Sequence, residues 1–394
     1  MSASTPQYAH TLVIGKLYPP HAGHLHLIRT ALAHTSASPS SHLTLILCHR
    51  PGEHPNGPIR HAWLSSLLAQ ELVSGRVRLM LVEDKYDQDD SRLWAQLTLD
   101  WIKHDDVPLA AVFTSEAYGA PYTQYLSEMS GIQVVHHCVD RPRVTFPVSG
   151  TLVRTRPLSV DSRLVSACVR AFYVPRIVLV GAESTGKSTL AAKLAQAFNT
   201  VWVPEVGRQV TEDKLQASGQ PMVDGQAATA DWHSGDFVAI ARAQADAEEA
   251  AALTLASEHG NVHGRVPVLV CDTDALATVI WHDRYMLLPP ASPAQETLTA
   301  VQTLNLVVAH ANAQRHSTIY LIPDVSKVPF VQDGTRDGEQ IREWMHERFI
   351  GELRGRGCEY HVLDGEEFEA REEQAKKIVM SVCERRGWQG GNKE

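Results

Sequence analysis

Two histidines three residues apart, His21 and His24, follow an apolar segment that predicts a buried β-strand. In an open α/β sheet, ligands bind beyond the carboxyl ends of the strands, beside helix N-termini whose N–H groups favour anions. Because residues at i and i+3 share one face of a helical turn, both imidazoles can donate hydrogen bonds to one polyphosphate. Gly23 carries no side chain that would block this approach. Together with Gly15 and Lys16, these residues predict a phosphate-binding site; the alternative is a pair of surface histidines in a proline-rich loop.

A second group of phosphate-binding residue types lies in the segment VSGTLVR, residues 148–154. Ser149 and Thr151 are of the types that begin helices, and Arg154 follows Thr151 by one helical turn. A guanidinium can bind two phosphate oxygens at once, beside the free N–H groups of a helix start. We therefore expect this segment to bind the same nucleotide as the two histidines.

The segment GAESTGKST, residues 181–189, matches the motif G-x-x-x-x-G-K-[ST] in full. It follows an apolar strand and precedes a helical segment, which is the context that this phosphate-binding loop requires. In such a loop, Lys187 bridges the β- and γ-phosphates of ATP and Ser188 ligates Mg²⁺. The expected ATP-binding residues of this loop are Gly181, Glu183, Ser184, Thr185, Gly186, Ser188 and Thr189.

Carboxylates follow two of the expected strands in the same half of the chain. Glu205, with Arg208 just after it, ends one strand, and Asp272 and Asp274 end the next in the sequence CDTD. Side chains at these strand ends point to the crevice where an acceptor hydroxyl binds, so one carboxylate can act as general base and another can bind Mg²⁺ or a ribose hydroxyl. The sequence does not decide whether Glu205 or Asp272 takes the proton, and for Asp274 a helix-capping role is the alternative.

Three further side chains are candidates for the same site. Arg336, in the loop of residues 323–339, can close over ATP as part of a lid; the alternative is a solvated cluster of charges. Trp281 and Tyr285 follow the Asp pair and can stack on a substrate ring, although aromatic residues at helical spacing also serve as core.

Short apolar segments rich in Val, Ile and Leu occur in two series and predict the strands that position these residues. The first series comprises residues 11–15, 43–48, 77–83, 110–115 and 132–137, and the second 176–181, 200–205, 266–274, 317–324 and 359–365. Near-continuous apolarity indicates strands that are buried on both faces, as in a parallel sheet covered by helices. We therefore expect an α/β protein of two domains, a Rossmann-like domain at residues 1–168 and a P-loop domain at residues 169–394, each with a mainly parallel sheet flanked by helices.

The composition supports two globular domains and excludes some function classes. The chain has 394 residues, of which 44% are hydrophobic and 21% charged, and its net charge of −9 gives no basic surface for nucleic acid. The six cysteines form no C-x-x-C pair, and no apolar segment is long enough to cross a membrane, so we expect a cytoplasmic protein. Nothing in the sequence decides between a monomer and a homo-oligomer.

The first-half motifs resemble the H-x-G-H and I-S-x-T-x-x-R signatures of the nucleotidyltransferase superfamily. With the P-loop, the segments VPEVGR, CDTD and PFVQDGTRDGE extend the likeness to most of the chain, which resembles the NadR family. Where the family pattern more often has an aromatic residue at position 17, this chain has Leu17 followed by Tyr18. The resemblance implies a bifunctional enzyme of NAD salvage, with a nicotinamide-nucleotide (NMN) adenylyltransferase domain followed by a ribosylnicotinamide kinase domain.

The resemblance also implies ligands and roles. The kinase would convert nicotinamide riboside to NMN with ATP and Mg²⁺, and the first domain would join NMN to the adenylyl group of ATP to give NAD and pyrophosphate. His21 and His24 would stabilise charge in the transition state, while Lys16 and Arg154 would hold the triphosphate. About ten residues precede the first expected strand, so we expect no helix-turn-helix and no DNA binding.

Two other functions fit the same motifs. One is a coenzyme A pathway fusion of an adenylyltransferase with a kinase, against which the CDTD and DGTRDGE segments argue. The other is a regulatory protein that binds NAD and ATP with weak turnover, against which the intact set of phosphate-binding residues argues.

Overall fold

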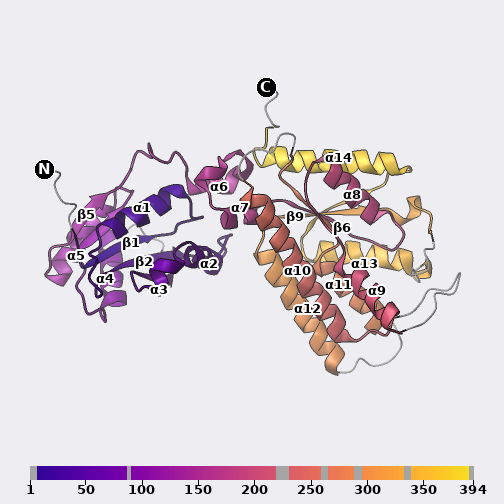
Figure 1. Cartoon of the computed structure of the whole chain (residues 1–394), viewed down its shortest axis with the longest axis horizontal. Coiled ribbons are helices and arrows are strands. Elements are labelled where there is room, and N and C mark those ends of the chain that lie inside the picture. The colour runs from indigo at the N-terminus through magenta and orange to yellow at the C-terminus, as the bar shows by residue number, and fades with distance from the viewer. Residues whose placement is uncertain are drawn as a thin grey trace. The chain divides into compact units, whose positions relative to one another are not determined.

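The structure is a computed structural model that describes residues 7–86, 90–218, 230–258, 265–287, 295–331 and 339–389. The chain divides into two compact units, Met1–Val169 and Arg170–Glu394. Each unit contains a five-stranded sheet, and every strand pair within the two sheets is parallel (Figure 1). The expected α/β class with two parallel sheets flanked by helices is therefore confirmed.

The sheet of the first unit has the order β3-β2-β1-β4-β5, as in a doubly wound fold. Its elements are β1 (His10–Gly15), α1 (Ala22–Ala33), β2 (His42–His49), α2 (Gly57–Leu67), α3 (Ala69–Val73), β3 (Val77–Glu83), α4 (Ser91–Ile102), β4 (Ala111–Thr114), α5 (Gly119–Ser130), β5 (Val135–Cys138) and α6 (Gly150–Thr155).

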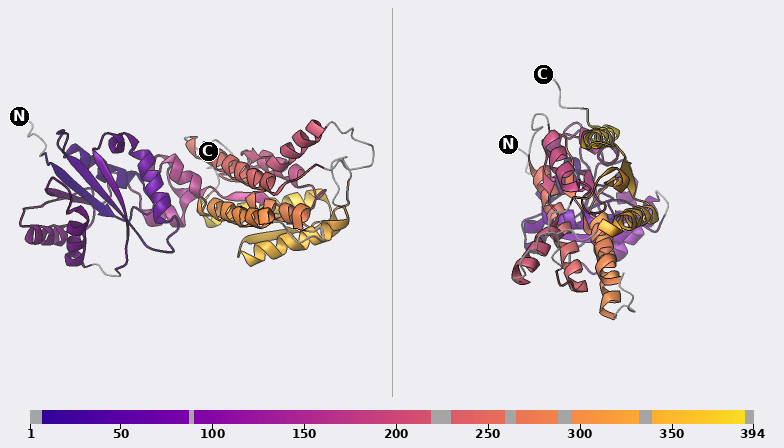
Figure 2. Two further views of the ribbon diagram at one scale, coloured as in Figure 1. Left: turned by 90° about the horizontal axis from the view of Figure 1, so that it is seen from below. Right: turned by 90° about the vertical axis from the view of Figure 1, so that its right-hand side faces the viewer.

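Strand β1 shows why both faces of this sheet are covered. Val13 packs with Leu27 and Ile28 of α1 on one face, whereas its neighbours Leu12 and Ile14 pack on the other face in a core that includes α4 and α5. Because successive side chains of a strand point to opposite faces, a strand buried on both sides must be apolar throughout. Figure 2 shows the helices on either side of the sheet.

The sheet of the second unit has the order β10-β9-β6-β8-β7. Its elements are β6 (Arg176–Leu179), α8 (Lys187–Ala197), β7 (Trp202–Val203), α9 (Val206–Ser218), α10 (Ser234–Ser257), β8 (Leu269–Asp272), α11 (Ala275–His282), the π-helical turn η3 (Asp283–Leu287), α12 (Gln295–Ala313), β9 (Thr318–Pro323), α13 (Arg342–Gly355), β10 (Glu359–Leu363) and α14 (Phe368–Arg385). Helix α7 (Ala167–Tyr173) spans the division between the two units.

Helices α8 and α14 cover one face of this sheet, and α10, α11, α12 and α13 lie on the other (Figure 1). The central strands β6 and β8 are buried along their whole length. The carboxyl ends of β6 and β8 therefore meet at one edge, where the P-loop and the CDTD segment begin. Within the described residues, no helix combines the length and the apolar character that a membrane crossing requires.

Candidate functional site

His21 and His24 lie together at the start of α1, next to the carboxyl end of β1. His21 is the N-cap residue of α1, and the two imidazole rings stack with 3.7 Å between their centroids and 20° between their planes. The Nδ1 atoms of both rings are buried and have no hydrogen-bond partner within the described part of the chain. Two adjacent, unsatisfied imidazole nitrogens at a helix N-terminus are suited to an oxygen-rich anion.

Both imidazoles are neutral near pH 7. Burial, with the nearby positive charge of Arg143, lowers the pKa of His21 to about 4. Burial lowers the pKa of His24 well below its ordinary value, and the proximity of His21 lowers it further. A bound polyphosphate favours the charged form, so its arrival would raise the pKa of both groups.

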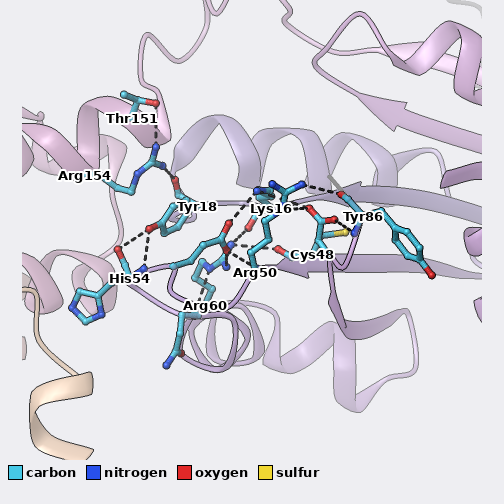
Figure 3. Close-up of polar contacts among 12 residues, drawn as sticks. Lys16, Tyr18, Cys48, Arg50, His54, Arg60, Tyr86, Thr151 and Arg154 are labelled. Atoms are coloured by element: carbon cyan, nitrogen blue, oxygen red, sulfur yellow. Dashed lines mark hydrogen bonds and ion pairs between the residues drawn. The ribbon is translucent and has the colours of Figure 1, made fainter. Parts of the chain in front are cut away.

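The ring of Tyr18 lies between two arginines and fixes the position of Arg154. The Arg154 guanidinium is 4.1 Å from the ring centroid and the Arg60 guanidinium is 4.7 Å from it. Arg154 also donates a hydrogen bond to the Tyr18 carbonyl oxygen, and the Tyr18 hydroxyl donates to the His54 carbonyl oxygen at 2.9 Å (Figure 3). Arg154 is thus held by contacts to the loop that follows β1.

The start of α6 packs directly against this loop. Ser149 caps the helix, since its hydroxyl accepts from the Leu152 N–H at 3.2 Å, and Thr151 accepts from Arg154 at 3.3 Å. A Cβ atom on Gly150 would lie 2.1 Å from the Tyr18 carbonyl oxygen, so only glycine permits this approach.

The other cations of this site are paired with carboxylates. Lys16 donates to Glu53 at 3.1 Å and lies 4.0 Å from Asp84, and Arg50 donates to Asp84 at 2.7 Å (Figure 3). Arg60, which is fully buried, pairs with Glu53. These partners hold Lys16 in the cleft that His24 also lines.

A cleft of about 1100 Å³ lies at the carboxyl edge of the first sheet. The predicted residues that line it are Gly15, Lys16, His24, Ser149, Thr151 and Arg154, while His21 stacks on His24 behind them. Sequence reasoning missed further lining residues, namely Arg50, Glu53, Asp84, Trp94, Glu116, Tyr118 and Arg143. Arg50, Glu53, Asp84 and Glu116 follow the ends of β2, β3 and β4. A position just after a strand end is the sequence feature that could have identified them.

The P-loop connects β6 to α8 and has the backbone that its motif predicts. Gly186 caps α8 with a φ of +80°, a conformation that glycine adopts without strain, and Lys187 is the first helical residue. The Lys187 ammonium donates to the Ala182 carbonyl oxygen at 2.7 Å and so lies across the loop. The Ser184 hydroxyl accepts from the Val331 N–H at 2.6 Å.

Lys187, Glu205 and Asp272 form an electrostatic cluster beside the loop. Burial lowers the pKa of Lys187, against the opposing effect of the two carboxylates, and burial raises the pKa of Glu205, against the opposing effect of Lys187. Asp272 is the last residue of β8, and its buried Oδ1 has no hydrogen-bond partner among the described residues. With the hydroxyl of Ser188, this oxygen makes a donor set that fits Mg²⁺.

The P-loop opens onto a second cleft of about 170 Å³. The predicted residues that line it are Glu183, Ser184, Thr185, Gly186, Lys187, Ser188, Thr189, Glu205, Arg208, Trp281 and Tyr285. Gly181, Asp272 and Asp274 are not among the lining residues, and Arg336 lies outside the described residues.

Trp281 and Tyr285 form an aromatic wall of this cleft, with their ring planes 20° apart. The Arg284 guanidinium lies 5.3 Å from the Trp281 ring and 4.6 Å from the Tyr285 ring, and it donates to Glu183 of the P-loop at 3.0 Å. Trp232 and Phe237, which carried no sequence signal, also line the cleft.

Asp274 does not line the second cleft, where we expected it to bind substrate. Its carboxylate caps α11 by accepting from the Leu276 and Ala277 N–H groups, and it accepts from the Tyr320 hydroxyl at 2.7 Å. The side chain is buried and its oxygens are occupied by these donors, so we do not place Asp274 among the substrate-binding residues.

Taken together, the chain has two α/β units, one with a P-loop and one with an imidazole-lined cleft, and both clefts have the features of phosphate-binding sites. A sequence profile of the AAA domain family matches residues 176–371, the P-loop unit. NadR of Salmonella typhimurium, described as a trifunctional NAD biosynthesis/regulator protein, is 30% identical over 214 residues, which cover 50% of this chain and 48% of the relative.

Two solved structures match the whole fold. A crystal structure of a NadR protein in complex with NR has a TM-score of 0.66 at 17% identity and covers 100% of both chains. A crystal structure of a NadR protein in complex with NAD and AMP-PNP has the same TM-score at 16% identity and covers 99% of this chain and 100% of that chain. The chain therefore has the fold of these two NadR proteins, and half of it is similar in sequence to the curated relative, about half of whose length it spans.

Proposed function

We propose that the protein is a bifunctional enzyme of NAD biosynthesis, in which the second unit phosphorylates nicotinamide riboside and the first unit adenylylates NMN. The observation that supports this proposal is the presence of two separate clefts, one at the carboxyl edge of each parallel sheet, each lined by residue types that suit phosphate. A kinase product that carries a new phosphate is a suitable substrate for an adenylyltransferase. The names of the NadR relative and the two NadR complexes support ATP, nicotinamide riboside and NAD as ligands.

In the second unit, Lys187 would bind the β- and γ-phosphates of ATP, and Glu205 would accept the proton of the riboside hydroxyl. We favour Glu205 over Asp272 as the base because Glu205 lines the cleft and its pKa is raised by burial, which strengthens a carboxylate as proton acceptor. Mg²⁺, held by Ser188 and Asp272, would neutralise charge on the phosphates.

The remaining groups of the second cleft would position the riboside. Trp281 and Tyr285 would stack on the nicotinamide ring, and Arg208 would bind a ribose hydroxyl or a phosphate. An aromatic wall is suited to a planar heterocycle and offers no anchor for the long arm of dephospho-coenzyme A.

In the first unit, the phosphate of NMN would attack the α-phosphorus of ATP in line, and pyrophosphate would leave. Lys16 and Arg154 would hold the triphosphate, and the imidazoles of His21 and His24 would donate hydrogen bonds to the oxygens whose charge increases in the transition state. Catalysis of this kind depends on positioning and charge stabilisation.

The decisive experiment supplies purified protein with ATP, Mg²⁺ and each candidate acceptor in turn. We expect NMN from nicotinamide riboside, NAD and pyrophosphate from NMN, and no product from dephospho-coenzyme A or pantetheine phosphate. Turnover of the last two alone would establish the coenzyme A alternative. Tight binding of NAD and ATP without turnover would establish the regulatory alternative.

A further inference from the structure

A cluster of ligand-type side chains lies at the amino edge of the first sheet, at the opposite edge from the cleft of that unit. His10 and His42 are the first residues of the parallel strands β1 and β2 and are direct register partners, and Asp105 follows α4. Among the described residues, this is the one group of three His, Cys, Asp or Glu side chains whose ligand atoms all lie within 4.8 Å of one another.

The geometry of the three side chains converges on one point. The Nε2 atoms of His10 and His42 lie 3.8 Å and 3.6 Å from the same oxygen, Oδ2 of Asp105. Ligand atoms around a tetrahedral metal ion are roughly 3.3 Å apart when each bond is near 2.0 Å. A contraction of a few tenths of an ångström would therefore bring each Nε2 atom to the separation from Oδ2 that a shared ion requires, and the ligand atoms all lie within 4.8 Å of one another.

Each histidine is already held in the tautomer that coordination requires. The Nδ1 of His10 faces the Val107 carbonyl oxygen at 3.0 Å, and the Nδ1 of His42 faces the Ser40 carbonyl oxygen at 3.4 Å. Because a carbonyl oxygen can only accept, both Nδ1 atoms carry the proton and both Nε2 atoms keep a lone pair. The Nε2 of His10 accepts from the Thr44 hydroxyl at 2.9 Å, and Asp105 Oδ2 lies 3.8 Å from it. Metal-bound histidines show this arrangement, in which the distal N–H donates to a backbone carbonyl.

The carboxylate of Asp105 is also placed so that one of its oxygens can coordinate a metal ion. Its side chain is 6% exposed, and Arg78 pairs with Oδ1, which leaves Oδ2 for the space between the imidazoles. Oδ2 has no hydrogen-bond partner in the described part of the protein. A buried carboxylate oxygen without a donor, close to two imidazole nitrogens, is unfavourable unless a cation or a proton lies between them.

We propose that His10, His42 and Asp105 form a binding site for a divalent transition metal ion, with Zn²⁺ the ion that this donor set suits best. Two imidazoles and one carboxylate leave a fourth position for water, and on coordination the Thr44 hydroxyl, now 2.9 Å from the His10 Nε2, gives up that nitrogen. The proposal is independent of the enzymatic function.

The site would tie the starts of β1 and β2 to the segment between α4 and β4. His10 is three residues from Val13, the nearest residue of β1 that lines the cleft, which is roughly 10 Å at the rise of a strand. We therefore expect the ion to stabilise the first unit and to take no part in phosphate chemistry.

The test is a titration of the chelator-treated, full-length protein with Zn²⁺ alone, and with Co²⁺ as a spectroscopic probe. We expect one tight equivalent with a micromolar or lower Kd, visible Co²⁺ absorption of a low-coordinate N/O site, and a rise in Tm of about 5 °C at saturating Zn²⁺. Weak Zn²⁺ binding, with a Kd above roughly 100 μM, would overturn the proposal.

Variants distinguish this cluster from the other histidines of the chain. His42→Gln and Asp105→Asn should each weaken Zn²⁺ binding by more than about 100-fold, whereas His61→Gln, a half-buried histidine of α2, should bind as the parent does. Zn²⁺ binding that is unchanged in the first two variants would refute the assignment. Since His42 is partly exposed, its variant carries the test if Asp105→Asn does not fold.

Discussion

Lys187 and His24 belong to different units, so each should control one reaction. We expect Lys187→Ala to lower NMN formation from nicotinamide riboside by at least ~100-fold and to leave NMN adenylylation nearly intact, and His24→Ala to do the reverse. Separate assays of the two half-reactions by chromatography check this. Lys193→Ala, an exposed lysine on the same helix as Lys187, is the matched control and should change neither rate. Loss of both activities in one folded single variant would contradict two independent sites.

The depressed pKa values of His21 and His24 predict proton uptake when ATP binds to the first unit. Both groups are neutral near pH 7 because burial disfavours their charged forms, and the phosphates raise their pKa values again. ATP should therefore bind the first unit more tightly as the pH falls from 8 to 6. The Lys187→Ala protein isolates this site, and calorimetry in two buffers of different ionisation enthalpy measures the protons taken up. An uptake that persists in a further His21→Asn His24→Asn variant would assign the protons to other groups.

At the level of elements, the strands were predictable because parallel-sheet strands must be apolar on both faces. The expected strands at residues 43–48, 77–83 and 317–324 agree closely with β2, β3 and β9. The strand expected at residues 200–205 is shorter, since β7 comprises only Trp202–Val203 and is followed by Pro204, which has no N–H group for the ladder.

The sites were only partly predictable from the sequence. A motif identifies the loop whose backbone approaches phosphate, but it does not identify the side chains from other segments that hold that loop in place. The P-loop and the two histidines are local patterns and were found. Arg60 and Tyr18 act through contacts between segments about 40 residues apart, and Trp232 joins the second cleft from the residues before α10. No spacing rule in one sequence specifies such contacts. Asp274 shows the reverse case, a strand-end carboxylate whose hydrogen bonds make it a helix cap.

Helix α6 depends on a glycine for its approach to the loop after β1. We expect Gly150→Ala to lower NMN adenylylation at least ~10-fold and to destabilise the first unit by about 1–3 kcal/mol, because the new methyl group would overlap the Tyr18 carbonyl oxygen. Urea unfolding and the adenylylation assay measure the two effects. Gly351→Ala in α13, where a Cβ meets no atom within 4 Å, should be neutral or stabilising by up to about 1 kcal/mol. Normal activity in Gly150→Ala would refute a tight α6 contact.

At the scale of the whole molecule, the two units should work when separated, provided that α7 stays intact. Arg170 of α7 donates to the Ala256 carbonyl oxygen, and the Phe172 carbonyl oxygen accepts from the His316 N–H at 2.8 Å, so the helix is bonded to the second unit. We therefore expect a fragment of residues 166–394 to phosphorylate nicotinamide riboside and a fragment of residues 1–165 to adenylylate NMN. A cut between residues 169 and 170 divides α7 and serves as the comparison. Inactive but folded fragments 1–165 and 166–394 would show that each reaction needs both units.

The contact of Arg154 with the Tyr18 ring affects how fast ATP binds to the first site. Because Arg154 is immobilised by that ring and by a carbonyl oxygen, its rotational freedom is lost during folding and not when the triphosphate arrives. ATP should then bind to the first site without a slow rearrangement of the Arg154 side chain. In a Tyr18→Leu variant, the Arg154 guanidinium would sample several rotamers before ATP binds. The association rate of ATP with the first site should then fall more than the rate of adenylyl transfer.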